Sequence, residues 1–350
     1  MKALALKYRP EIFEDVSEQE YIIKILKYQI ETKTHKNCYL FTGGAGTGKT
    51  TSARIFAKEL NSGKGTAIEI DAASNNGVDD VRKIIDEAKY KSISSEYKVY
   101  ILDEVHMLSA GAWNAMLKLI EEPPAKTIFI MCTTDPQKIP KTILSRVQRY
   151  DFQRLSLKAI VDRLKYIIAR ENKDILVDED TIITYEEEAL IYIAKLSEGG
   201  MRDAIMFMDK CLSYSAYLTS EVVLKVLGSI SYSDLFDLLN SILDINKEDI
   251  LKKIDDFYNS GLNLKQFVKD FMMFLLEVIR YYILQDFKYV NIPEAYQDKL
   301  THMEEFYDDI DLLLQYMNDL RNDIKWESNP KALIEIKLLQ YLKEITLEDK

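Results

Sequence analysis

The sequence contains very few of the side chains that build metal centres and disulfide frameworks. Only three cysteines and three histidines occur among its 350 residues. Cys38, Cys132 and Cys211 are too few and too widely spaced for a disulfide framework or a cysteine-based zinc site. Three histidines are likewise too few for a multi-histidine metal centre. We therefore expect reduced thiols that pack as small apolar side chains, and we expect no zinc.

Long hydrophobic runs are also missing. The longest, Phe271–Leu276, is followed by Glu277, whereas a membrane-spanning helix needs roughly 18 or more apolar residues. Lys2, Lys7 and Arg9 interrupt the first ten residues before the apolar core of a signal peptide can form. Because 47% of the residues are nevertheless hydrophobic, the chain can bury a sizeable core. These features predict a soluble, cytoplasmic protein of two or three domains.

Basic residues are outnumbered by acidic ones. The chain has 46 Lys and Arg against 57 Asp and Glu, a formal net charge of −11, which argues against a protein that coats nucleic acid non-specifically. The negative charge is distributed unevenly along the chain. Residues 1–150 contain 22 Lys and Arg and 19 Asp and Glu, a net of +3, which leaves −14 for the other 200 residues. We therefore expect any contact with DNA to lie in the first half of the chain.

Short apolar runs alternate with helical stretches up to about residue 155. Each run is apolar almost throughout, as expected of a parallel sheet that helices cover on both faces. The expected strands are residues 37–42, 67–71, 98–103, 127–133 and 148–152. After Phe152 the strand pattern stops, and apolar residues recur at helical spacing, for example at Ile160, Leu164 and Ile168. The first part of the chain is therefore predicted to be a doubly wound α/β domain.

A second boundary is expected near Gly228. A compact helical segment precedes it, and long amphipathic helices with a face rich in Tyr and Leu follow it. We therefore expect an α/β domain over residues 1–155, a helical domain over residues 156–227 and a second helical domain over residues 228–350.

One glycine-rich motif carries the strongest indication of function. It reads Gly43-Gly44-Ala45-Gly46-Thr47-Gly48-Lys49-Thr50 and lies between an expected strand and an expected helix. Its glycines allow backbone N–H groups to point inward as an anion-binding nest, at the positive end of the following helix. Lys49 would supply a point charge to the β and γ phosphates of a nucleotide, and the Thr50 hydroxyl would be a ligand of Mg²⁺. The motif therefore predicts a phosphate loop.

Two carboxylates follow the third expected strand. Asp103 at the strand end can reach the Mg²⁺ shell opposite Thr50, and Glu104 is placed to polarise a water for in-line attack on the γ phosphate. The motifs with which a GTPase recognises guanine are missing, since Asn172-Lys173-Asp174 has the wrong spacing. The sequence therefore predicts ATP and Mg²⁺ as ligands.

Three weaker indications lie further along the chain. Thr133-Thr134 ends the next strand, so a hydroxyl there could lie beside the γ phosphate. Arg146 follows the fourth strand, and Arg202 opens a helix in the second segment. A guanidinium that arrives from a neighbour or a lid can stabilise the charge of a phosphoryl transition state. Taken alone, each arginine could equally be an ordinary surface ion pair.

Further motifs follow one another in order. They are Tyr8-Arg9-Pro10 with Phe13, Ile68-Glu69-Ile70-Asp71-Ala72-Ala73-Ser74, Asp103-Glu104-Val105-His106-Met107-Leu108, Leu119-Ile120-Glu121-Glu122-Pro123-Pro124, Thr133-Thr134-Asp135-Pro136-Gln137-Lys138-Ile139-Pro140, Ile143-Leu144-Ser145-Arg146 and Gly200-Met201-Arg202-Asp203-Ala204. With the phosphate loop, they resemble the gamma/tau subunits of the bacterial DNA polymerase III clamp loader, which are AAA+ ATPases. The resemblance is dense over residues 4–227 and looser through the third segment, which would be the oligomerisation collar.

The resemblance implies an ATP site. Lys49, Thr50, Asp103 and Glu104 would be the ATPase residues, with Thr50 and Asp103 as the Mg²⁺ ligands. The residues that would bind ATP are Tyr8, Arg9, Pro10, Gly43, Gly44, Ala45, Gly46, Thr47, Gly48, Lys49, Thr50, Thr51 and Arg202.

It also implies side chains that sense ATP or contact other molecules. Thr134 would be sensor 1, with Thr133 as its rival, and Arg202 would be the sensor-2 arginine of a helical lid. Arg146 would be an arginine finger that acts on a neighbouring subunit. The residues that would line a DNA-binding chamber are Arg82, Lys118 and Lys138.

The sequence departs from the family pattern in several places. The family's four-cysteine zinc module is replaced by residues 61–66, which contain no cysteine, so zinc is not implied. Val147 replaces a cysteine, one apolar residue for another. Glu18 stands where the family has glycine, which leaves the contacts to adenine there in question. The chain also resembles the short form that lacks the domains binding helicase and polymerase.

The function implied is ATP-driven loading of a sliding clamp onto primed DNA. The implied partners are delta-like and delta-prime-like subunits, further copies of the chain, the clamp and primer–template DNA. Two alternatives remain open, a scaffold subunit without ATPase activity and a different AAA+ machine such as a branch-migration motor. The intact Lys49, Thr50, Asp103 and Glu104 argue against the scaffold, and the 71–74 and 121–124 motifs argue against the other machine.

Overall fold

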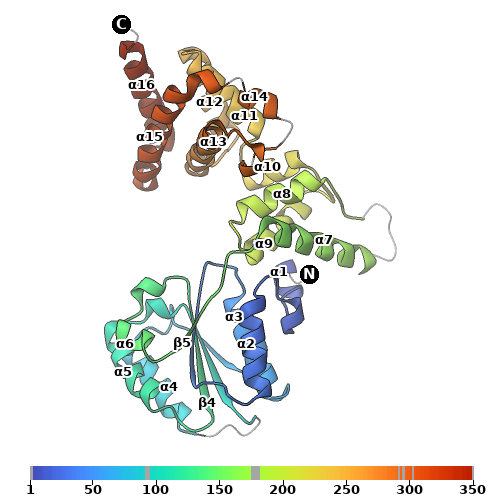
Figure 1. Cartoon of the computed structure of the whole chain (residues 1–350), viewed down its shortest axis with the longest axis vertical. Coiled ribbons are helices and arrows are strands. Elements are labelled where there is room, and N and C mark those ends of the chain that lie inside the picture. The colour runs from blue at the N-terminus through green and yellow to red at the C-terminus, as the bar shows by residue number, and fades with distance from the viewer. Residues whose placement is uncertain are drawn as a thin grey trace. The chain divides into compact units, whose positions relative to one another are not determined.

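The chain forms two compact units, Met1–Ser220 and Glu221–Lys350 (Figure 1). A computed structural model describes residues 3–90, 95–174, 182–290, 292–293, 296–301 and 303–348. Each unit has its own core. The predicted domain boundaries after residues 155 and 227 stay predictions.

A five-stranded parallel sheet is the centre of the first unit. Its strands are β1 (Cys38–Thr42), β2 (Ile68–Asp71), β3 (Lys98–Asp103), β4 (Thr127–Thr133) and β5 (Gln148–Asp151), and their order is β2-β3-β4-β1-β5. Each expected strand is found to within one residue at either end, and the α/β prediction is confirmed. In the sheet, β1 lies between β4 and β5, so the phosphate loop that follows β1 leaves an interior strand.

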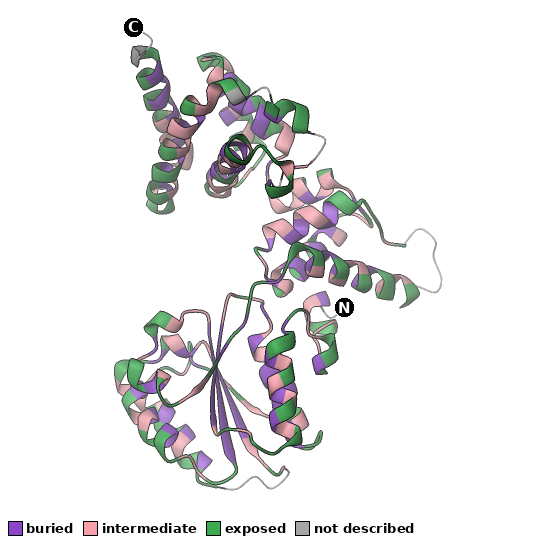
Figure 2. Ribbon diagram, viewed as in Figure 1, coloured by how far each residue is buried: buried purple, intermediate pink, exposed green. Residues whose placement is uncertain are grey.

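Helices cover both faces of this sheet. They are α2 (Glu20–Glu31), α3 (Lys49–Leu60), α4 (Val78–Ala88), α5 (Ala110–Glu121) and α6 (Lys141–Leu144), with short 3₁₀ turns η1 (Phe13–Asp15), η2 (Val105–Met107) and η3 (Pro136–Lys138). Alternate residues of β1 point to opposite faces, so that Phe41 packs in a core with Leu26 and Phe56, and Leu40 packs in a core with Met116. All five residues of β1 are buried, and Figure 2 shows the strands at the centre of the sheet largely in purple. Burial on both faces is why β1, β3 and β4 read as nearly continuous apolar runs, whereas the edge strands β2 and β5 include exposed polar residues.

The first unit continues as a helical segment, which comprises α7 (Leu157–Asp174), α8 (Glu187–Leu196) and α9 (Met201–Leu212). The expectation that strands end at Phe152 is wrong, because β6 (Thr184–Tyr185) and β7 (Tyr217–Leu218) pair in parallel. Strands of two residues are too short to produce a hydrophobic period. The N-terminal helix α1 (Leu4–Lys7) packs against α9, where the Leu4 N–H donates to Asp209 Oδ2 at 3.1 Å.

The second unit is helical wherever the structure describes its regular elements. These are α10 (Ser220–Leu227), which begins at the boundary, α11 (Tyr232–Leu243), α12 (Lys247–Asn259), α13 (Leu264–Leu284), η5 (Phe287–Tyr289), α14 (Gln297–Thr301), η7 (Glu304–Phe306), α15 (Tyr307–Asp323), η8 (Ile324–Trp326) and α16 (Pro330–Glu348). Its core includes Phe236, Phe271, Leu313 and Tyr341. Within the described residues, no helix combines the length and the apolar character needed to cross a membrane.

Side-chain caps begin several of these helices. Ser231 Oγ accepts a hydrogen bond from the Asp234 N–H, Asn246 Oδ1 accepts one from the Asp249 N–H, and Asn263 caps α13 in the same way. Each cap satisfies an N–H group that the helix itself leaves free, and such a contact stabilises a helix by about 1 kcal/mol. These local contacts set where the amphipathic segments begin.

Candidate nucleotide-binding site

The phosphate loop requires glycine at two positions for steric reasons. Gly43 has φ +144°, and a Cβ there would lie 2.4 Å from the Phe152 carbonyl oxygen. Gly46 has φ +70°, and a Cβ there would lie 3.0 Å from the Cα of Gly200, at the start of α9. The Met201 N–H donates to the Gly46 carbonyl at 3.1 Å. The loop is therefore in direct contact with the helical segment.

Lys49 is enclosed by the loop it follows. Its side-chain Nζ donates to the carbonyl oxygens of Gly43 at 2.8 Å and Gly44 at 2.6 Å, and the residue is only 6% exposed. Burial lowers the pKa of this ammonium below its usual value. A buried cation of this kind favours an anionic ligand that lies close to it.

Thr50 and Asp103 meet at the carboxyl ends of the strands. Thr50 Oγ1 donates to Asp103 Oδ2 at 2.8 Å, and the other carboxylate oxygen accepts the Glu104 N–H at 3.0 Å. Two adjacent oxygen ligands of an octahedral Mg²⁺, each about 2.1 Å from the metal, lie roughly 3 Å apart. The two residues therefore fit Mg²⁺ both by the chemistry of their oxygens and by their spacing.

Glu104 lies in a cluster of polar groups at the ends of β3 and β4. Its Oε2 accepts from Thr134 Oγ1 at 3.0 Å and from the Thr134 N–H at 3.4 Å, and it lies 3.2 Å from His106 Nδ1. The Thr133 hydroxyl lies instead 3.2 Å from the same ring nitrogen. The structure thus brings Thr134, and not its rival Thr133, to the Glu104 carboxylate. The sensor-1 role itself stays a prediction.

Sequence reasoning missed His106 as a contact of Glu104. His106 belongs to the Asp103–Leu108 motif, but the motif alone does not tell where its ring points. The 3₁₀ turn η2 that follows Glu104 folds the ring back towards the carboxylate. The sequence indicated this contact only through the position of His106, a polar residue two places after Glu104.

A pocket of about 460 Å³ opens beside the phosphate loop, and we call it the loop pocket. Of the residues predicted to bind ATP, those that line it are Tyr8, Arg9, Pro10, Gly46, Thr47, Gly48, Lys49, Thr50, Thr51 and Arg202. Gly43, Gly44 and Ala45 do not line it. The lining residues that sequence reasoning missed are Ala3, Ala5, Leu6, Asp15, Val16, Ser17, Leu155, Arg163, Met201, Ile205 and Met206. Most of these are apolar, and in the sequence they are indistinguishable from residues of a helix core.

Positive charge gathers on one side of the loop pocket. Arg9 Nε donates to Thr51 Oγ1 at 3.2 Å. Burial, followed by the charge of Arg54, lowers the pKa of the Arg9 guanidinium, and Arg202 lowers it further. Arg54 itself pairs with Glu69, and a negative ligand beside Arg9 and Arg202 would offset the repulsion between these like charges. The arrangement suits a ligand with several negative charges.

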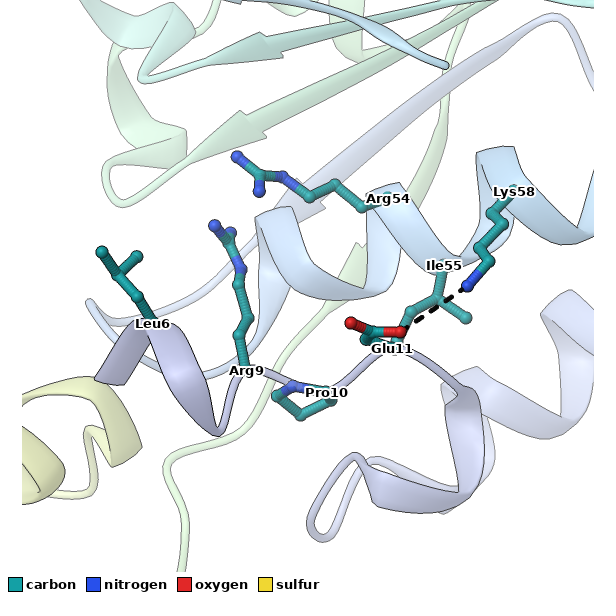
Figure 3. A pocket seen from close by; sticks show the side chains of 7 residues that line it. All are labelled: Leu6, Arg9, Pro10, Glu11, Arg54, Ile55 and Lys58. Atoms are coloured by element: carbon teal, nitrogen blue, oxygen red, sulfur yellow. Dashed lines mark ion pairs between the residues drawn. The ribbon is translucent and has the colours of Figure 1, made fainter. Parts of the chain in front are cut away.

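A second pocket, of about 280 Å³, adjoins this charged side (Figure 3). Leu6, Arg9 and Pro10 line both pockets. Arg54 and Lys58 enter it from α3, and Lys58 Nζ lies 3.9 Å from the exposed Glu11 carboxylate. The cationic surface therefore extends beyond the loop pocket along α3.

The N-terminal residues connect the loop pocket to the helical segment. The Tyr8 hydroxyl donates to Glu171 Oε1 at 2.5 Å, and Lys7 Nζ lies 2.7 Å from the same oxygen. Arg163 NH2 donates to the Tyr8 carbonyl at 3.1 Å. The residues around Tyr8 are thus held by α7, whereas Arg9 contacts α3.

Glu18 also contacts the helical segment. Its backbone is left-handed, with φ +54°, a conformation that glycine adopts most easily. One carboxylate oxygen accepts the Ser156 N–H at 2.7 Å and the other accepts the Ser156 hydroxyl, immediately before α7. Glu18, where the family has glycine, therefore adds side-chain hydrogen bonds to the residue that precedes α7.

The remaining predicted residues lie outside the loop pocket. Arg146 is exposed, and it donates to Glu121 Oε1 at 2.9 Å and to the Thr142 carbonyl at 2.8 Å. Arg82, Lys118 and Lys138 are exposed as well. Arg82 and Lys138 pair with the carboxylates of Asp79 and Asp135, at 3.0 and 3.2 Å. Their predicted roles towards a neighbouring subunit and towards DNA stay predictions.

The sheet order, the phosphate loop after β1, the Asp-Glu pair after β3 and the helical segment against the loop define an AAA+ P-loop protein. A solved structure of a Thermotoga maritima RuvB variant has the same fold, with a TM-score of 0.50 and 21% identity. The match covers 68% of this chain and 80% of that one. At this identity the likeness shows the fold alone.

Family profiles and curated relatives identify the family. Residues 66–156 match "DNA polymerase III, delta subunit", and residues 218–349 match "DNA polymerase III subunits gamma and tau domain III". DNA polymerase III subunit gamma of Buchnera aphidicola subsp. Baizongia pistaciae is 32% identical over 96% of this chain and 95% of its own length. The Bacillus subtilis tau subunit is 36% identical over 97% of this chain, which spans 63% of that relative. The chain belongs to the gamma/tau family of DNA polymerase III subunits, and the resemblance inferred from its motifs is confirmed.

Proposed function

We propose that this protein is an ATP-hydrolysing subunit of a clamp loader, which opens a sliding clamp and loads it onto primed DNA. One observation carries the proposal. In a chain of the gamma/tau family, Lys49 and Thr50 line the loop pocket, and Thr50 bonds to Asp103, which lies with Glu104 at the carboxyl end of β3. A scaffold subunit would not need all four side chains in this arrangement.

Each of these side chains has a distinct task in the proposed reaction. Lys49 exchanges its two carbonyl acceptors for phosphate oxygens and pairs with their charge. Thr50 and Asp103 would hold Mg²⁺, which when bound would neutralise negative charge on the nucleotide phosphates. Glu104 orients the attacking water and accepts its proton while the bond between the β and γ phosphates breaks.

The helical segment is proposed to respond to ATP. Arg202 and Met206 line the loop pocket from α9, and Tyr8 is tied to α7. A triphosphate in the pocket would attract Arg202 and bring α9 closer to the phosphate loop. Contacts made only when ATP is present supply the free energy that such a change of conformation needs.

Arg146 is proposed to act on a neighbouring subunit. It is exposed and is absent from the loop pocket of its own chain. In an open ring of subunits, this guanidinium would reach the next subunit's ATP and stabilise the transition state. Hydrolysis would then depend on assembly, and DNA that aligns the subunits would trigger it. The proposed partners are delta-like and delta-prime-like subunits, further copies of this chain and the sliding clamp.

The test is the ATPase rate of the complex reconstituted with its partner subunits. We expect the sliding clamp and primed DNA each to raise the rate, and the two together to raise it most. Lys49→Ala should abolish ATP binding. Glu104→Gln should still bind ATP and hold the clamp while turnover falls by about 10²–10⁴-fold. A rate that neither clamp nor primed DNA changes would contradict the proposal.

A further inference from the structure

We propose that His106 is a positioning residue for Glu104, and that its Nδ1–H holds the carboxylate in the orientation that water activation needs. This inference rests on the proposed ATPase function, and it concerns a residue that the site motifs leave without a role. It starts from a single atom, Glu104 Oε2. Thr134 donates to this oxygen from Oγ1 at 3.0 Å and from its N–H at 3.4 Å, and His106 Nδ1 lies 3.2 Å away.

The proposed role requires one tautomer of the imidazole. A carboxylate oxygen can accept a hydrogen bond from Nδ1 only if that ring nitrogen carries the proton. In the neutral ring, Nε2 is then the unprotonated nitrogen. The Thr133 hydroxyl lies 3.2 Å from the same Nδ1 and accepts the Asp135 N–H at 3.0 Å, and in the proposed tautomer its oxygen also shares the Nδ1 proton with Glu104.

The ring is anchored more firmly than the carboxylate it contacts. Thr133 is fully buried in β4, and the His106 side chain is 13% exposed. The Glu104 side chain is 38% exposed, and its backbone has the left-handed φ of +50°, which a residue other than glycine adopts only when neighbouring contacts impose it. The rigid strand thus orients the ring, and the ring orients the carboxylate.

His106 matters most once ATP is present. Thr134 is predicted to turn its hydroxyl towards the γ phosphate, and it would then donate to phosphate instead of Glu104. The His106 Nδ1–H would remain as the side-chain donor to Oε2. The other carboxylate oxygen, Oε1, stays available to take the proton of the attacking water. His106 itself gains and loses no proton in this scheme.

The first arm of the test does not depend on ATP hydrolysis. Long-range ¹H–¹⁵N NMR of ¹⁵N-histidine-labelled protein at a pH where imidazoles are neutral reports which ring nitrogen is protonated. Only three histidines occur, so His106→Asn assigns the signal and His35→Asn serves as the control. We expect His106 to be protonated at Nδ1, and Glu104→Ala to shift it towards the Nε2–H form. If His106 is protonated at Nε2 and Glu104→Ala does not change its signal, the proposed contact is wrong.

The second arm measures turnover by the assembled complex. His106→Phe keeps an aromatic ring but removes the donor, and we expect kcat to fall by about 10–100-fold with little change in KM for ATP. His106→Asn supplies an amide N–H near the position of Nδ1 and should recover most of kcat. If Asn is as inactive as Phe, or if Phe leaves kcat unchanged, the positioning role is wrong. A wild-type complex without ATPase activity would refute the proposed function instead, while the tautomer measurement would still test the contact.

Discussion

Around the phosphate loop, some side-chain roles could be predicted from motifs, and others depend on how the chain folds. The motifs predicted Lys49, Thr50, Asp103 and Glu104, because each role depends on a residue type at a fixed distance from a strand end. The contacts of His106 and Tyr8 could not be predicted, since they depend on where a turn or an N-terminal segment folds. Adjacent Thr133 and Thr134 also share one sequence context, and only their different contacts at the end of β4 separate them.

Lys49 gives ATP binding a defined dependence on pH. Burial lowers its pKa in the free protein, whereas a bound phosphate favours the charged ammonium. As the pH rises through the lowered pKa, binding must take up a proton, so ATP affinity should fall by up to about tenfold per pH unit. Titrations of a fluorescent ATP analogue between about pH 7 and pH 10 would measure this slope. Lys49→Arg, which remains charged, should give a flatter profile, and parallel profiles would rule out Lys49 as the cause.

At the scale of elements, the interior strands β1, β3 and β4 were predictable because burial on both faces leaves a continuous apolar run. The edge strands β2 and β5 are only partly buried and include exposed residues. Strands β6 and β7 were not predictable, since a pair of two-residue strands is held by tertiary contacts and has no period of its own. The contacts between the phosphate loop and α9 were equally invisible. They depend on a loop and a helix that lie more than 150 residues apart in the sequence.

The contact of Gly46 with α9 can be tested with a matched pair of variants. Gly46 and Gly63 have similar positive φ angles of +70° and +77°, so alanine strains both backbones alike, by about 1–2 kcal/mol. A Cβ at Gly46 would press on Gly200, whereas a Cβ at Gly63 would meet nothing within 4 Å. Gly46→Ala should therefore weaken ATP binding by at least about tenfold, and Gly63→Ala should leave it nearly unchanged. Equal losses in ATP titrations would mean that backbone strain alone is responsible.

At the scale of the whole molecule, net charge limits where a ligand such as DNA could bind but does not identify the ligand. The +3 of residues 1–150 restricts where DNA could lie, but exposed cations in this half also pair with nearby carboxylates, as Arg82 and Lys138 do. The sequence also could not show which neighbouring subunit Arg146 would contact. The exposed position of Arg146 is compatible with a neighbour's site, yet that neighbour is another molecule.

The role of Arg146 between subunits predicts complementation. Lys49→Ala chains lack a working ATP site but retain Arg146, and Arg146→Ala chains have the opposite defect. Each variant alone should be inactive in the assembled complex, and mixed complexes should recover part of the ATPase rate, because some interfaces join two intact halves. A mixture of Lys49→Ala with Glu104→Gln is the control, since both changes damage the same site. Failure to complement, with mixed assembly verified by native mass, would exclude the role between subunits.

Charge predicts where DNA binds. Arg82, Lys118 and Lys138 are exposed, and none of them lines the loop pocket, so their joint replacement by alanine should leave ATP affinity intact. DNA-stimulated hydrolysis should be lost, and the slope of log affinity for DNA against log salt should flatten by about one counterion per lost contact in each subunit. Fluorescence anisotropy over a range of salt concentrations measures that slope. An unchanged slope would place the DNA path elsewhere.

The most direct measurement is the transfer of a sliding clamp to primed circular DNA by the reconstituted complex. We expect clamps to become topologically linked to the circle in the presence of ATP, so that they remain bound at high salt and are released when the circle is linearised. Lys49→Ala should abolish transfer, and Glu104→Gln should leave the clamp trapped with the loader. ATP hydrolysis that DNA stimulates without any linked clamp would contradict the account and indicate a different kind of motor.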